Sequence, residues 1–161
     1  MVQVHLAQMH NRLSTEPLIN IGSAMAGPEA QVVADGEEGI YLRNKGLGPG
    51  RVASVAYFLD RAPGATGTAD AVAFDKIADA LVKTGIVNSL VTDAPEMDEY
   101  IKENEQIKLL LVRSSKVMKR EEWIAFLDKR FGMTITYCSI YDDCSTACYR
   151  NGRSSIGKAC K

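Results

Sequence analysis

Four cysteines are the residues of this chain whose type and spacing most readily support chemistry. They are Cys138, Cys144, Cys148 and Cys160, and all lie within the last 24 of 161 residues. An even set crowded into one segment is typical of a loop held by two disulfides in an oxidising compartment. The gaps of five, three and eleven residues, with no histidine nearby, do not fit the usual spacing of a zinc site.

Three pairings of four cysteines are possible, and turn chemistry favours one of them. Cys138 and Cys144 flank the predicted turn Tyr141–Asp143, so a chain reversal there brings their Cα atoms within disulfide reach. Cys148 and Cys160 then close a second loop through the turn-prone dipeptide Asn151-Gly152. We expect both disulfides to brace the tail while the core upstream folds without them.

The same cysteines allow an enzymatic alternative. Cys144, five residues and Arg150 match the spacing of loops that resemble those of protein tyrosine phosphatases, in which a thiolate attacks phosphorus and the arginine binds the equatorial oxygens. Asp143 or Asp142 could then act as the acid. Against this alternative, the five residues contain no glycine to turn their amides inward, and Cys148 could form a disulfide with Cys144 in an oxidising compartment.

Charge and hydropathy exclude several classes of function. Nineteen Lys and Arg stand against 20 Asp and Glu, so the chain lacks the basic field that nucleic acid would require. No stretch reaches the roughly 18 apolar residues of a membrane-spanning helix, and we expect membrane contact only through a missing anchor. Both histidines, His5 and His10, lie in the lead-in segment 1–16, where a solvated stub is the simpler interpretation than a metal site. We expect no cofactor and no metal.

The chain between these segments predicts a mainly β domain over residues 17–144, with two inserted helices. Short apolar runs bounded by turn residues predict the strands: Leu18–Ala26, Gly39–Arg43, Val52–Leu59, Ile86–Val91, Ile107–Val112 and Met133–Ile140. An apolar stripe from Phe74 to Val82, capped by Asp70 or Thr68 and closed by Gly85, predicts one helix. Lys119–Phe131 predicts the other, with Trp123 in the core.

The connecting segments are predicted to be solvent-exposed turns and loops. Asn44, Gly46, Gly48 and Pro49 predict a tight turn between two antiparallel core strands; Pro49 and the strand that follows argue against a phosphate-binding loop. The acidic segment Asp93–Glu105 predicts a loop. The basic, cysteine-rich tail 145–161 is expected to be solvated as well.

Several stretches resemble a group of uncharacterised bacterial membrane-anchored proteins. They are Gly39–Val52 with its Asn44–Pro49 turn, Val55–Asp60, His10–Pro17 and Thr136–Tyr141, which together fall within residues 10 to 60 and 133 to 144. Two features depart from the pattern. Gly50 stands where the pattern has a small residue that bears a side chain, and two further cysteines follow Cys144. In that group a transmembrane helix precedes an immunoglobulin-like β-sandwich outside the cytoplasm. The resemblance implies this fold and location, and it carries no activity, ligand or functional residue with it.

Two hypotheses about function follow. The leading one is a non-enzymatic extracytoplasmic interaction or sensing domain with an unknown protein partner, because two histidines near the N-terminus and scattered acids assemble no nucleophile, base and orienting group. The alternative is a thiol-dependent phosphatase-like enzyme that uses Cys144 and Arg150.

Overall fold

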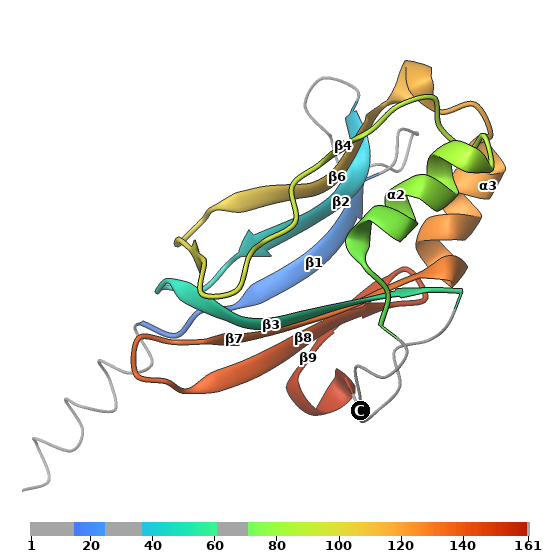
Figure 1. The fold of residues 1–161 in the computed structure, drawn as a ribbon. Helices are drawn as coiled ribbons and strands as arrows, with labels where there is room; N and C mark the ends of the chain where they lie inside the picture. The colour runs from blue at the N-terminus through green and yellow to red at the C-terminus, as the bar shows by residue number, and fades with distance from the viewer. Residues whose placement is uncertain (1–14, 25–36, 61–70, 161) are drawn as a thin grey trace, which may run out of the picture.

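The computed structural model describes residues 15–24, 37–60 and 71–160. In this part of the chain two antiparallel sheets lie face to face, and two helices pack at one end of the sandwich (Figure 1). The mainly β prediction is confirmed. His5, His10, Thr68, Asp70 and most of the lead-in segment lie outside the described residues.

Each sheet combines strands that are distant in sequence. Sheet A has the order β1-β2-β6-β4, with bounds Ile19–Ala24, Glu37–Asn44, Gln106–Arg113 and Val91–Thr92. Sheet B has the order β5-β3-β7-β8-β9, with bounds Tyr100–Ile101, Gly50–Leu59, Phe131–Cys138, Cys144–Arg150 and Arg153–Ile156. The strands of both sheets pair antiparallel. Successive side chains of a strand point to opposite faces of its sheet, so alternate side chains face the space between the two sheets.

The helices close one end of this space with apolar side chains. Helix α2 spans Phe74–Lys83 and buries Ile77 and Leu81, while α3 spans Arg120–Ala125 and continues as the π-helical turn η3, Phe126–Arg130. Trp123 is fully buried, as predicted. Short 3-10 turns η2, Ser114–Lys116, and η4, Gly157–Cys160, complete the elements. No helix in the described ranges is long and apolar enough to span a bilayer.

Several element boundaries differ from the sequence predictions, among them the predicted strand at Ile86, the end of the second helix and the end of β7. The predicted strand Ile86–Val91 is wrong, because Ile86 and Val87 are buried beside the helices and only Val91–Thr92 joins a sheet. The second helix ends at Arg130, and Phe131 already begins β7. Strand β7 ends at Cys138 rather than Ile140, because the Ser139 N–H donates across the turn to the Asp143 carbonyl at 2.9 Å.

The first helix also departs from its predicted form. Its N-cap is Ala73, which makes no side-chain capping hydrogen bond, while the predicted caps Asp70 and Thr68 lie outside the described residues. Val82 is 45% exposed although it belongs to the predicted apolar stripe. Gly85 does adopt the positive φ, +70°, that closes the helix.

Two connections differ in kind from the prediction. The turn Asn44–Gly50 does not form a hairpin, because β2 pairs within sheet A and β3 within sheet B. It therefore carries the chain from one sheet to the other. The tail predicted as a loop is instead the strand pair β8 and β9, and β8 pairs with β7 over its whole length from Cys144 to Tyr149.

Candidate functional site

The cysteines form the two disulfides that the turn argument favoured. Cys138 is joined to Cys144 with their Cα atoms 4.0 Å apart, and Cys148 is joined to Cys160 with a Cα separation of 5.7 Å. Cys138 and Cys144 are register partners in the β7–β8 ladder, so this disulfide lies across two neighbouring strands. The second disulfide fastens η4 to β8.

This arrangement separates the residues of the phosphatase-like alternative. Cys144 and Arg150 are the first and last residues of β8, and six extended steps place their Cα atoms about 20 Å apart. A phosphate held by Arg150 would lie far from the sulfur of Cys144, which is also bonded to Cys138. Asp142 and Asp143 lie beside Cys144 in the β7–β8 turn, at the opposite end of the strand from Arg150. The structure therefore does not assemble the predicted catalytic set.

Strand register instead gathers a different group at the far end of the sandwich from the helices. Tyr100 pairs with Arg51, Arg51 pairs with Cys138, and Cys138 pairs with Cys144, which forms one row across β5, β3, β7 and β8. Directly paired residues of antiparallel strands share a face. An aromatic ring, a guanidinium and a disulfide thus lie side by side on the outer face of sheet B.

Arg51 ties this row to two loops. Its guanidinium binds the Asp98 and Asp142 carboxylates, each at 2.9 Å. The hydrogen bonds that Arg51 donates to Asp98 and, second in effect, to Asp142 raise the pKa of Arg51 above its usual value. Both aspartates adopt positive φ, 67° at Asp98 and 59° at Asp142, so each presents its carboxylate from a tight turn. Both ion pairs of Arg51 are solvent-accessible, so they contribute more to the alignment of the two loops than to the stability of the fold.

The turn that carries Asp142 is closed by its own hydrogen bonds. The Asp142 N–H donates to the Ser139 carbonyl at 3.0 Å, and the Tyr141 N–H donates to the Ser139 hydroxyl at 3.1 Å. With the Cys138–Cys144 disulfide at its base, the turn has one defined shape. It holds Ile140 and Tyr141 outward, at 54% and 46% exposure.

Asn44 organises the turn on the other side of Arg51. The side chain is fully buried; its Oδ1 accepts from the N–H groups of Leu18 and Gly46, and its Nδ2 donates to the carbonyls of Gly48 and Ile101. Four hydrogen bonds satisfy both ends of the amide. One side chain thus joins the start of β1, the turn itself and β5.

The glycines of this turn are required for close packing. A Cβ at Gly46 would lie 2.3 Å from the Glu16 carbonyl oxygen, and one at Gly48 would lie 2.0 Å from that of Thr15. Only glycine leaves room for the entering chain at these positions. The predicted turn residues Asn44, Gly46 and Gly48 are therefore structural.

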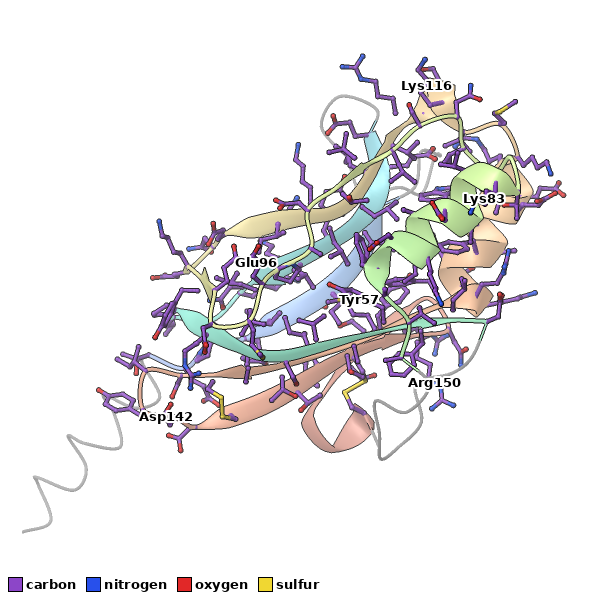
Figure 2. The ribbon with its side chains drawn as sticks, in the orientation of Figure 1. Tyr57, Lys83, Glu96, Lys116, Asp142 and Arg150 are labelled. Atoms are coloured by element: carbon purple, nitrogen blue, oxygen red, sulfur yellow. A yellow bond between two sulfur atoms is a disulfide. The ribbon has the colours of Figure 1, made fainter. Side chains whose placement is uncertain are left out.

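Together these turns leave large apolar side chains in solvent at one end of the molecule. We name this set the loop-end surface: Leu18, Leu47, Tyr100, Ile140 and Tyr141, which are 43% to 61% exposed. Figure 2 shows Asp142 at this end, opposite the helix end where Lys83 and Lys116 lie. Rigid apolar and aromatic side chains around an arginine are typical of the centres of protein interfaces.

Other candidate groups carry less. A shallow hollow lies between η3 and the β8–β9 turn, lined by Asp128, Lys129, Asn151, Gly152 and Arg153. Its lining has one carboxylate and two cationic side chains, and no cysteine, serine or histidine. An ion pair joins the buried Glu38 of β2 to the exposed Arg120 of α3 and fastens that helix to sheet A. Among the described residues, no group of three or more His, Cys, Asp or Glu side chains could hold a metal ion.

Comparison with known proteins does not assign the site. No protein-family model, curated protein or solved structure matches the chain. The site is therefore defined by its geometry alone.

Sequence reasoning missed the central residues of the loop-end surface. Arg51 and Tyr100 stand in segments predicted as turn and loop, and nothing in their local spacing distinguishes them. The signal that would have found them is register, which depends on how β3 pairs with β5 and β7.

Proposed function

We propose that this chain is a non-enzymatic extracytoplasmic interaction domain that binds a protein partner through the loop-end surface. The observation that carries the proposal is the exposure of five large apolar side chains on hydrogen-bonded turns and strand ends at one end of the sandwich. A single exposed leucine needs no explanation, whereas a cluster framed by a hydrogen-bonded turn, a disulfide and Arg51 is typical of a recognition surface.

The exposed apolar side chains at the helix end are a weaker candidate for a partner-binding surface. Val82 and Met118 are also exposed, with Lys83 and Lys119 next to them; the loop end has an exposed lysine too, Lys45, but it also has Arg51 and two tyrosines. Lysines are depleted at interface centres, whereas tyrosine and arginine are enriched there. The described chain has two exposed tyrosines, Tyr100 and Tyr141, and both belong to the loop-end surface.

The wider setting of the proposal rests on chemistry and topology. Two disulfides favour a compartment outside the cytoplasm. Two face-to-face antiparallel sheets, with a connection that crosses between them at Asn44–Gly50, support an immunoglobulin-like sandwich. Thr15 enters beside Gly48, so an N-terminal membrane anchor, as the resemblance implies, would hold the domain by its loop end.

Site-specific photocrosslinking in the native cell tests this proposal. A photoreactive amino acid is placed at Leu47 or Tyr141, and matched positions at Val82 and Ile124 of the helices serve as controls with similar exposure. We expect one discrete protein adduct from both loop-end positions and none from the helices. Adducts from the helix positions alone would place the interface elsewhere and reject the proposal.

A thiol-labelling experiment addresses the enzymatic alternative. The native protein is treated with an alkylating reagent and mapped by mass spectrometry. We expect no modification of Cys144, because its sulfur is bonded to Cys138. A reactive thiolate at Cys144 in the native protein would favour the enzyme instead.

A further inference from the structure

One segment joins the edges of the two sheets and borders the loop-end surface. We name it the strap: residues 91–105, which run from β4 at the edge of sheet A through β5 at the edge of sheet B. Figure 2 shows Glu96 on this segment. The strap has a single base, Lys102, and six acids: Asp93, Glu96, Asp98, Glu99, Glu103 and Glu105. Since the whole chain has a formal charge of -1, this imbalance is local.

Hydrogen bonds hold the backbone of the strap in place. The Asp98 N–H donates to the Val52 carbonyl and the Val52 N–H donates to the Glu99 carbonyl, both at 2.8 Å. The Glu96 N–H donates to the Glu99 carboxylate at 2.9 Å, and Ile101 anchors the segment in the core. A partner would therefore meet carboxylates carried on an ordered backbone, which loses little entropy on binding.

Little of this charge is neutralised within the molecule. Among the described residues, Asp98 is the strap acid that forms an ion pair, and its partner Arg51 is shared with Asp142. The other five acids form no ion pair with a described lysine or arginine. The strap thus presents a negative field along the open side of the sandwich.

Apolar side chains are interleaved with these acids. Val91 is 65% exposed, Met97 is 72% exposed and Tyr100 is 51% exposed. Tyr100 also belongs to the loop-end surface, so the two surfaces are continuous. An exposed apolar surface bordered by unpaired carboxylates complements a segment that carries both basic and apolar side chains.

We propose that the partner presents a segment rich in lysine or arginine, with apolar residues between them, and that this segment lies along the strap. The inference rests on the proposed function, because it names the chemistry of the partner bound at the loop-end surface. The carboxylates attract the segment and set its orientation, while Val91, Met97 and Tyr100 bury its apolar side chains.

A defined peptide and charge-matched variants test the inference. The probe is a short fluorescent peptide of alternating lysine and leucine; a lysine–serine peptide and a glutamate–leucine peptide serve as comparison probes. The strap variant combines Asp93→Asn, Glu96→Gln and Glu103→Gln, and the control variant combines Asp75→Asn, Asp79→Asn and Glu121→Gln on the helices. Both variants change the net charge equally, and all six side chains are exposed.

We expect the lysine–leucine peptide to bind the wild-type chain better than either comparison peptide, and binding to weaken as salt rises above about 0.1 M. The strap variant should bind about tenfold more weakly, whereas the control variant should change affinity less than about twofold. Equal losses from both variants would mean that net charge alone attracts the peptide, and would overturn the inference.

Two further outcomes separate this inference from the proposed function. A loop-end photoadduct whose contact segment is not basic would retain the proposed function and overturn the inference. Salt-sensitive dimerisation of the chain that the strap variant abolishes would identify a second copy as the occupant and also overturn it. Peptide binding that depends on the strap, without any loop-end photoadduct, would reject the loop-end surface as the interface. The inference that the partner segment carries basic and apolar side chains would be retained.

Discussion

The two ends of the sandwich use apolar side chains in opposite ways. At the helix end Trp123, Phe126 and Leu81 are fully buried, and the Trp123 and Phe126 rings lie nearly parallel with centroids 6.3 Å apart. At the loop end the amide of Asn44 is buried beside the apolar Ile19 and Ile101, while Leu47 and Tyr141 remain in solvent. Hydrophobic burial thus closes both ends, and at the loop end the hydrogen bonds of a buried amide are added to it. These hydrogen bonds order the turn backbone, so its outer apolar side chains can remain exposed for a partner.

The largest effect is expected at the helix end. Trp123→Ala should lower the free energy of unfolding by about 3 to 5 kcal/mol, because a fully buried ring is replaced by a cavity. Urea denaturation measures this change. Ile124→Ala, at a 39% exposed position on the same helix, should change the free energy far less. A loss below about 1 kcal/mol for Trp123→Ala would show that the helix end is not sealed by burial.

Removal of the buried amide should come next. Asn44→Ala leaves the Leu18 N–H and the Ile101 carbonyl without their partner, and should lower the free energy of unfolding by about 2 to 3 kcal/mol. Asn88→Ala, at an exposed asparagine, is the matched control. Equal stability of the two variants would contradict the contribution of the buried Asn44 amide to the loop end.

The Cys138–Cys144 disulfide should raise the free energy of unfolding by about 2 kcal/mol. This contribution is modest because the loop that the disulfide closes is short. We expect graded treatment with a dithiol to reduce it before Cys148–Cys160, since each disulfide has one buried cysteine, but its other cysteine, Cys144, is exposed whereas Cys160 is partly buried. Differential alkylation with mass mapping gives the order. The sheets should stay folded after this first reduction, and cooperative loss of all structure would contradict that expectation.

A smaller effect should follow from the ion pair near the helix end. The hydrogen bond from Arg130 lowers the pKa of Asp60 below its usual value, so the pair stabilises the fold at neutral pH and loses this effect as pH falls through the lowered pKa. Asp60→Asn should be less stable by under about 1 kcal/mol at pH 7. The difference from wild type should vanish at low pH, and a difference that persists there would have another origin.

The smallest effect on stability is expected where the effect on binding is largest. Leu47→Ser and Tyr141→Ser should change the free energy of unfolding by less than about 0.5 kcal/mol, because both side chains are exposed. The same variants should abolish the photoadduct formed from a probe at Ile140. Strong destabilisation by either variant would mean that these side chains support the fold rather than a partner.

The sequence alone determined the features that arise from local chemistry. Short apolar runs bounded by turn residues predicted β1, β2, β3 and β6, the dipole-matched charges and apolar stripe predicted buried Trp123 in a helix, and the spacing around Tyr141–Asp143 favoured the observed disulfide pairing. Each of these depends on neighbours within a few residues, so the local pattern contains the information. The turn at Asn44–Pro49 was predicted for the same reason, although it connects the two sheets instead of two paired strands.

Only the tertiary structure decided which of these elements meet. The tail became β8 and β9 because the free edge of β7 pairs with it, and the apolar run at Ile86 became a contact of the helix end rather than a strand. Arg51, Tyr100 and the Cys138–Cys144 disulfide share a row because three strands far apart in sequence pair in one register. Register is set by long-range burial and backbone hydrogen bonds, which no local pattern contains. For this reason the sequence predicted most of the strands and helices of the sandwich. The loop-end surface could be recognised only from the way in which the strands pair.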